Sequence, residues 1–153
     1  MKPSSQLPTW ATIHALEIRE EYPAVIDALE ARLAVDPADS EAVIRLGFNL
    51  WYAVAEQMRM QRDFPAERYA GRFMELFQLY ATTLSDNADF CWAFGLGMSL
   101  FWFYFPGATE QEGNRLLDHA RRTEPFWANL REPGHDLSRL KGRGIFAAYY
   151  NVR

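Results

Sequence analysis

Cysteine is almost absent from this chain of 153 residues, in which Cys91 is the only one. A single thiol excludes a disulfide within the chain and leaves no cysteine pair to bind a metal, which fits a reducing compartment. Histidine is also scarce, because only His14, His119 and His135 are present, and no two of them form a His-x-x-x-His pair. We therefore predict no metal site and expect each histidine to have a structural or surface role.

Motifs that carry known chemistry are also missing. The chain has no Gly-x-Ser-x-Gly elbow, no Walker phosphate loop and no dinucleotide fingerprint. Cys91 lies in an apolar run, where burial raises the pKa of a thiol and makes it a poor nucleophile. Asp86 and Asp89 flank a predicted helix start, so helix capping accounts for both. We predict a protein that is not an enzyme and binds no cofactor; the alternative, an enzyme, would need a site assembled from residues far apart in the chain.

The sequence also lacks a targeting or membrane-spanning segment. The N-terminus, MKPSSQLPTWATIHALE, has no run of roughly 7 to 15 apolar residues such as a signal peptide needs, so we expect a cytoplasmic protein. The longest apolar run, residues 90–105, is shorter than the roughly 20 residues that cross a bilayer and stops at Pro106. We predict a buried helix and no membrane contact. The alternative is a helix with one face kept for a partner, because a helix that is apolar all round must be covered.

Aromatic residues, in contrast, are abundant: eleven Phe, seven Tyr and five Trp make up 15% of the chain. Together with an apolar fraction of 49%, they exclude disordered and low-complexity classes. No segment shows the alternation of apolar and polar residues that is typical of a strand, whereas apolar residues recur at the helical spacings of three and four. We predict an all-α fold of about six to seven helices, including helices near 24–35, 40–60, 69–80, 90–105 and 109–124. We expect most aromatic rings to fill the seams between stacked helices.

A turn followed by a glycine occurs twice with the same spacing. Pro37 lies ten residues before Gly47, and Ser85 lies ten residues before Gly95. A glycine in a helix allows a partner helix to approach closely. Two such units with helix breakers between them are typical of stacked helix pairs.

These units resemble the tetratricopeptide repeat. In the first unit, the spacing of Pro37 and Leu46-Gly47 matches that of the repeat. In the last unit, the matching residues are Leu117, Ala120 and Pro125. The resemblance covers about residues 22–130 and implies a stack of antiparallel helix pairs. We expect one helical-repeat domain, residues 1–153, in which a C-terminal helix at about 136–152 caps the last repeat.

The net charge of −4 is unevenly distributed. Residues 1–42 hold three basic and eight acidic side chains, whereas residues 115–153 hold eight basic and four acidic ones. Glu17, Glu20 and Glu21 lie close together, and on one helix Glu17 and Glu21 would share a face. This cluster is either a solvated helix face or an acidic patch that attracts a basic partner.

The basic C-terminal segment has two interpretations as well. Arg139, Lys141 and Arg143, followed by Tyr149 and Tyr150, have the composition of a nucleic-acid-binding surface. The chain as a whole is acidic, however, and it holds no known RNA- or DNA-binding module. We therefore predict no nucleic-acid partner and expect the segment to cover the helical stack.

A second resemblance covers most of the chain. It lies in the ordered phrases ALEARLAVDPAD, VIRLGFNLWYAVAE, YATTLSDNADFCWAFGLGMSLFWFYF, NRLLDHARRTEPFW and LKGRGIFAAYY. Together they resemble small bacterial immunity proteins of polymorphic toxin systems, which include Rhs, type VI secretion and contact-dependent toxins. This resemblance implies a cytosolic protein that binds one cognate secreted toxin and occludes its active site. The alternative function is a tetratricopeptide-like adaptor or chaperone that binds a peptide or effector protein.

The toxin partner is expected to be basic, because nuclease toxins commonly are, and an acidic surface would speed its association. Aromatic side chains dominate the energetics of such interfaces. We therefore place the partner-binding surface mainly in the N-terminal third, with these candidate residues: Trp10, Glu17, Glu20, Glu21, Tyr22, Tyr52, Glu56 and Tyr69. Tyr52 can equally be a core residue, and we make no prediction of the oligomeric state.

Overall fold

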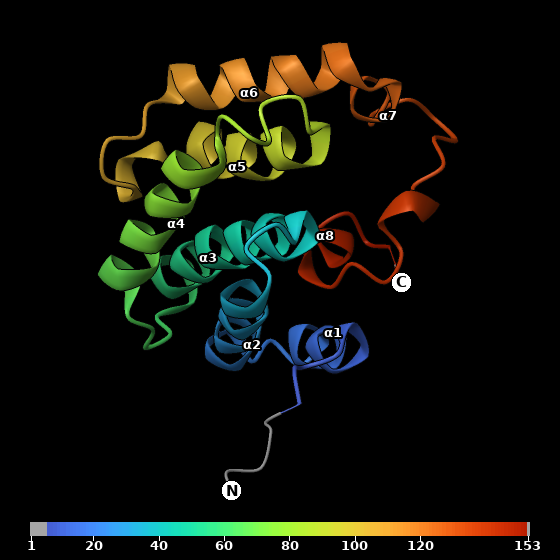
Figure 1. Ribbon diagram of the computed structural model, residues 1–153. Helices are drawn as coiled ribbons and strands as arrows, with labels where there is room; N and C mark the ends of the chain where they lie inside the picture. The colour runs from blue at the N-terminus through green and yellow to red at the C-terminus, as the bar shows by residue number, and fades with distance from the viewer. Residues whose placement is uncertain (1–5, 153) are drawn as a thin grey trace, which may run out of the picture.

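The computed structural model describes residues 6–152, which form helices and no strand (Figure 1). The elements are α1 (Trp10–Ile18), α2 (Tyr22–Val35), α3 (Ser40–Met60), α4 (Ala66–Tyr80), α5 (Ala88–Phe101), the 3₁₀ turn η1 (Trp102–Tyr104), α6 (Glu110–Thr123), α7 (Pro125–Ala128), the 3₁₀ turn η2 (Ser138–Leu140) and α8 (Ile145–Ala148). The predicted all-α fold is confirmed. Six of the α-helices have nine residues or more, and α7 and α8 are single turns of four residues.

Side-chain caps fix where α3, α5 and α6 begin. Asp39 caps α3 and Thr109 caps α6, each accepting a hydrogen bond from a backbone N–H in the first turn. At α5 the cap is Asn87, so the assignment of capping to Asp86 and Asp89 is wrong. Asp89 instead lies in the first turn of α5 and accepts hydrogen bonds from distant parts of the chain.

The long helices form a stack of packed pairs. In Figure 1, α6, α5 and α3 follow one another as layers from the top, and α2 and α1 lie below them. α2 packs on α3, α3 packs on both α4 and α5, and α5 packs on α6. Residues 6–152 contain no helix that is both long enough and apolar enough to cross a bilayer. Residues 1–5, which belong to the segment considered for a signal peptide, lie outside the described residues.

Glycines allow the closest helix contacts, as expected at Gly47 and Gly95. A Cβ atom at Gly47 would overlap the ring of Phe94, and one at Gly95 would lie 2.9 Å from Leu116 Cβ. Gly113 of α6 lies directly against the backbone of Ser99 in α5. The contact between α5 and α6 is therefore backbone against backbone and has no room for another methyl group.

Gly113→Ala is expected to lower the free energy of unfolding by about 1–3 kcal/mol, because the new methyl group would push α6 away from α5. Gly71→Ala is the matched control, since Gly71 lies within α4 and has nothing within 4 Å of the added Cβ. It should stabilise the protein by about 0.5–1 kcal/mol through helix propensity. Urea unfolding of both variants measures the difference; equal effects would contradict the close α5–α6 contact.

The C-terminal segment differs from the prediction. Residues 136–152, here called the strap, do not form one helix but contain only η2 and α8. Gly142 and Gly144, with φ of 79° and 59°, interrupt helical backbone between these two elements. α8 packs mainly on α1 and α3, so the strap returns to the start of the stack instead of forming a capping helix on α6.

Two arginines of the strap form ion pairs within the protein. The Arg143 guanidinium donates to Glu41 at 2.6 and 2.9 Å and to Asp89 at 2.8 Å. Arg139 donates to Asp89 at 2.7 Å and to Glu124. The strap therefore binds the acidic side chains of its own chain, and these ion pairs join α3, α5 and the end of α6.

Candidate protein-binding groove

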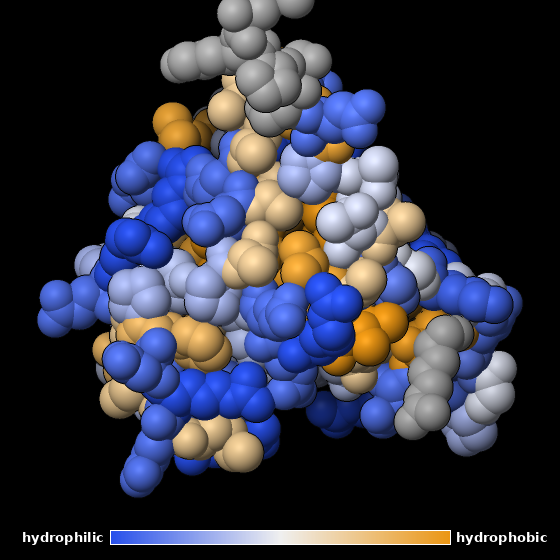
Figure 2. Space-filling view, turned by 90° about the horizontal axis from the view of Figure 1, so that it is seen from below, coloured by the Kyte–Doolittle hydropathy of each residue, from blue (hydrophilic) through white to orange (hydrophobic). Residues whose placement is uncertain are grey.

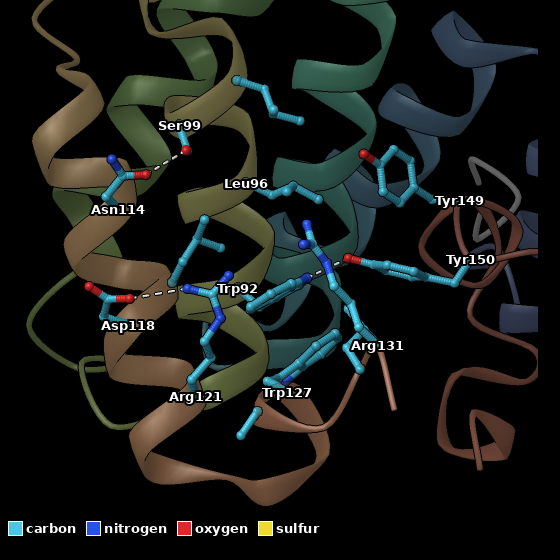
Figure 3. Close-up of a pocket in the computed structure, with 14 residues that line it drawn as sticks. Trp92, Leu96, Ser99, Asn114, Asp118, Arg121, Trp127, Arg131, Tyr149 and Tyr150 are labelled. Atoms are coloured by element: carbon cyan, nitrogen blue, oxygen red, sulfur yellow. Dashed lines mark hydrogen bonds and ion pairs between the residues drawn. The ribbon is translucent and has the colours of Figure 1, made fainter. Parts of the chain in front are cut away.

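A groove of about 830 Å³ lies between α5, α6, α7 and the strap (Figure 3). On its aromatic side, the indoles of Trp92 and Trp127 stack with their centroids 4.7 Å apart and their planes 11° from parallel. Trp92 Nε1 donates a hydrogen bond to the hydroxyl of Tyr150, whose pKa is raised by burial. Side chains from α5, α7 and the strap thus hold this side of the groove in one arrangement.

The opposite side of this groove is polar and comes from α6. Asn114, Asp118 and Arg121 point toward the cavity in Figure 3. Asn114 accepts a hydrogen bond of 2.6 Å from Ser99, and Arg121 donates to Asp118 at 3.1 Å. The Arg121 guanidinium also lies 5.2 Å from the ring of Trp92. A cation already rests on an aromatic face in this part of the groove.

A second cavity, of about 410 Å³, continues the first, because Leu100 and Tyr149 line both. We call it the Glu56 pocket. It lies between the ends of α3 and α5, and its aromatic lining consists of Trp51, Tyr52, Phe101, Tyr104 and Tyr149. Phe101 is central to this lining, since it stacks on Trp51 at 5.8 Å and on Tyr104 at 6.0 Å. The pocket is thus walled by rings from α3, α5, η1 and the strap.

Large apolar side chains are exposed around the Glu56 pocket. Between 37% and 58% of the surface of each is accessible, and we call them the aromatic rim: Met58, Leu100, Trp102, Phe103 and Tyr149. The expectation that the rings of residues 90–105 fill helix seams holds for Phe90 and Phe94, which are buried, but it is wrong for Trp102 and Phe103. The reason is that α5 ends at Phe101, and η1 then turns the next rings outward.

Glu56 is the charged group of this pocket. It is only 5% exposed, and within residues 6–152 its carboxylate accepts one hydrogen bond, of 2.6 Å, from Arg59. The Arg59 side chain itself is 71% exposed. Burial raises the pKa of the Tyr52 hydroxyl, and the negative charge of Glu56 raises it further. The pocket therefore combines aromatic walls with a buried negative charge.

Glu17, in contrast, is a buried carboxylate with a full set of partners. Its two oxygens accept hydrogen bonds from Arg45, from Asn49 at 3.3 Å and from the backbone N–H of Ile145 at 2.6 Å. All three of the side chains in this network are nearly inaccessible to solvent. Glu17 therefore holds the strap onto α1 and α3 and is closed to a partner.

The predicted acidic patch is not formed. α1 ends at Ile18, Glu20 has a φ of 57°, and α2 begins at Tyr22, so Glu17 and Glu21 do not share a helix face. Glu20 and Glu21 are exposed and pair with arginines, Glu20 with Arg62 at 2.8 Å and Glu21 with Arg19 at 3.3 Å. In Figure 2, the face over α1 and α2 is largely hydrophilic with separate apolar spots. The prediction missed the chain reversal before Pro23, which separates the two helices.

The other candidates are divided between the core and the Glu56 pocket. Tyr22 and Tyr69 are buried, and Trp10 is half-buried with the guanidinium groups of Arg32 and Arg45 at 4.2 and 4.7 Å from its ring. Only two of the eight candidates, Tyr52 and Glu56, line the pocket. The structure brings these two together with Tyr22, whose ring is 5.9 Å from that of Tyr52.

The groups considered for catalysis have structural surroundings. His14 accepts a hydrogen bond of 3.2 Å from the backbone N–H of Gly144, and His119 lies 3.7 Å from Asp86. Cys91 is buried, and burial raises the pKa of its thiol to about 11, as the apolar run predicts. Across residues 6–152, no three His, Cys, Asp or Glu side chains are grouped as metal ligands would be.

Comparison with known protein families, curated proteins and solved structures finds no match to this chain. The groove must therefore be interpreted from its own residues.

Several residues of the groove were absent from the sequence-based candidates. Trp92, Trp127 and Tyr149 lie far apart in the sequence and meet only because the strap returns to α3 and α5. The rim carries a local signal, because the phrase LFWFYF at the end of the apolar run places five aromatic rings directly before Pro106. A helix that stops there cannot bury all of them on one face.

Proposed function

We propose that this protein binds another protein through the aromatic rim and the groove behind it. The observation that carries this proposal is the rim itself: Met58, Leu100 and Tyr149 line the cavity, and the exposed rings of Trp102 and Phe103 lie next to Tyr104 of its wall. Contiguous apolar patches on a protein surface commonly mark interaction sites. Aromatic side chains of this kind contribute most of the binding energy at protein interfaces.

The partner in this proposal is a cognate bacterial toxin, which the protein neutralises in the cytosol by occluding its active site. Two phrases that resemble the immunity proteins of polymorphic toxin systems contribute to the groove. LFWFYF supplies most of the rim, and LKGRGIFAAYY supplies the part of the strap that ends in Tyr149 and Tyr150. The residues that carry the resemblance are thus also residues of the proposed interface.

The adaptor or chaperone alternative has less support from the arrangement of the helices. α8 of the strap packs on α1 and α3. The ring centroid of Phe146 lies 4.9 Å from that of Phe48 and 5.6 Å from that of Trp127. An extended peptide would have to displace this strap in order to lie along that face of the stack. A folded partner that docks on the rim requires no such change.

Co-expression tests the proposal. The product of the gene adjacent to this one should stop bacterial growth when produced alone, and the present protein should restore growth and form a tight one-to-one complex with it. A double substitution, Trp102→Ala with Phe103→Ala, should weaken the complex at least about 30-fold, as expected for central aromatic anchors. Leu79→Ala is the matched control, because Leu79 is 61% exposed on α4 and lines neither cavity of the groove.

A harmless neighbour would overturn the toxin assignment. Binding of several unrelated peptides at micromolar strength would favour the adaptor instead. If the complex forms but the rim variant and Leu79→Ala bind equally well, the interface lies elsewhere on the protein.

A further inference from the structure

Two buried glutamates of this protein differ in how well their carboxylates are satisfied. Glu17 accepts hydrogen bonds from two side chains and one backbone N–H. Glu56, almost as buried, accepts one hydrogen bond in the described part of the chain, from the exposed Arg59. A carboxylate offers about four acceptor positions, and leaving them unused in a buried site is unfavourable. Glu56 therefore has acceptor capacity left for a donor that enters from the groove.

The walls of the Glu56 pocket suit a positively charged donor. Aromatic faces attract cations within about 6 Å of the ring centre. This chain uses that contact elsewhere in its fold, where Arg32 lies 4.2 Å from the ring of Trp10 and Arg121 lies 5.2 Å from the ring of Trp92. The lining of the Glu56 pocket offers aromatic rings of the same kind next to a negative charge.

Arg59 indicates which cation fits best. Its guanidinium already lies on the Glu56 carboxylate, which shows that this group can reach and bind the acid. The pair is local, at a spacing of three residues on α3, and the arginine is 71% exposed, so Arg59 can move off the carboxylate into solvent without disturbing the core. An incoming guanidinium could replace it at little cost. A planar guanidinium also stacks on rings and binds a carboxylate through two donors, which an ammonium group does not do.

From this geometry we infer that the Glu56 pocket binds an arginine side chain of the partner protein, with the guanidinium on the Glu56 carboxylate and between the aromatic rings of the lining. The inference rests on the proposed function, because it assigns a contact within that interface. It adds a specificity determinant: a partner that lacks an arginine at the matching position is not bound tightly.

A small probe tests the pocket without the toxin. Titration with N-acetyl-arginine methylamide should shift the indole Nε1–H resonance of Trp51, which lines the pocket and whose Nε1 is buried without a partner in the described residues. The indole of Trp127, which is bonded to Asp89 at 2.9 Å and lies outside the pocket, should stay unchanged. The neutral isostere N-acetyl-citrulline methylamide should have no effect at the same concentration. Equal shifts with both compounds, or none with either, would overturn the inference.

Three substitutions test the contact in the complex. Glu56→Gln should weaken the partner's binding at least about 30-fold, as expected when one member of a buried charge pair is removed. Glu110→Gln makes the same change in net charge at an exposed position in the first turn of α6 and should leave binding unchanged. Arg59→Ala should act in the opposite direction and tighten binding, because it removes the competing guanidinium.

The sign of the Arg59→Ala effect distinguishes the pocket from a merely structural role of the Glu56–Arg59 pair. If that role were structural, both substitutions would weaken binding, and the inference would be wrong. Failure of the inference is also distinguishable from failure of the proposed function. If Glu56→Gln still rescues growth and binds with unchanged affinity, the arginine contact is wrong but the proposed interface stands. If the arginine probe binds but the neighbouring gene product does not, the pocket stands and the toxin assignment is wrong.

Discussion

Glu17→Ala is expected to lower the free energy of unfolding by about 3–5 kcal/mol, the cost of removing one member of a buried ion pair. Arg45 would remain inside the protein with its charge uncompensated, because its side chain is only 3% exposed. Asn49 and the backbone N–H of Ile145 would lose an acceptor at the same time. Since Glu17 lies on α1 and Ile145 on α8, the substitution should also loosen the strap.

Chemical denaturation measures the loss of stability, and amide hydrogen exchange at Ile145 measures the loosening. Glu21→Ala is the matched control, since Glu21 is an exposed glutamate in a surface ion pair with Arg19. It should change the free energy of unfolding by less than about 1 kcal/mol. A comparable, small effect of both substitutions would contradict the role given to Glu17.

Gly144→Ala is expected to lower the free energy of unfolding by about 3–4 kcal/mol, for two reasons. Gly144 has a φ of 59° and a ψ of −129°, a conformation that strains any residue with a side chain by about 1–3 kcal/mol. In addition, a Cβ atom at this position would overlap the carboxylate of Glu17 and displace it from Ile145. The second effect should dominate because it breaks the buried network.

Gly142→Ala separates the two contributions. Gly142 also has a positive φ, of 79°, but nothing lies within 4 Å of the added Cβ, so only the backbone strain of about 1–2 kcal/mol should remain. Gly144→Ala should also lower the free energy of unfolding less in the Glu17→Ala background than in the native protein, because the alanine at position 17 leaves room for the new methyl group. Equal costs of Gly142→Ala and Gly144→Ala, or strictly additive effects of Gly144→Ala and Glu17→Ala, would contradict the proposed overlap.

The helices could be predicted from the sequence because their signals are local. Apolar spacing and caps such as Asp39 and Thr109 act within one or two turns, and the structure places α3 and α6 where those signals indicate. Gly47 and Gly95 also lie at close helix contacts, as their repeated spacing suggests. Local patterns were sufficient for the long helices α2 to α6, but not for the C-terminal segment, where the helix expected at about 136–152 is not formed.

The course of the strap and the composition of the groove could not be predicted in the same way. The hydrogen bond from Ile145 to Glu17 joins residues 128 positions apart, and no local pattern reports such a contact. The cluster of Glu17, Glu20 and Glu21 was interpreted as one surface, although the chain turns between α1 and α2 and buries only Glu17. The acidic character of a glutamate does not show whether it lies in the core or faces a partner. Its burial and its hydrogen-bond partners in the structure distinguish the two cases.

Amide hydrogen exchange of the one-to-one complex with the adjacent gene product tests the central claim most directly. The claim is that a partner docks on the aromatic rim and the Glu56 pocket. We predict that binding slows exchange at the end of α3, from the end of α5 through η1, and around Tyr149, while α2 and α4 exchange as they do in the free protein. Protection confined to α1 and α2, with no change at η1 and Tyr149, would contradict the account.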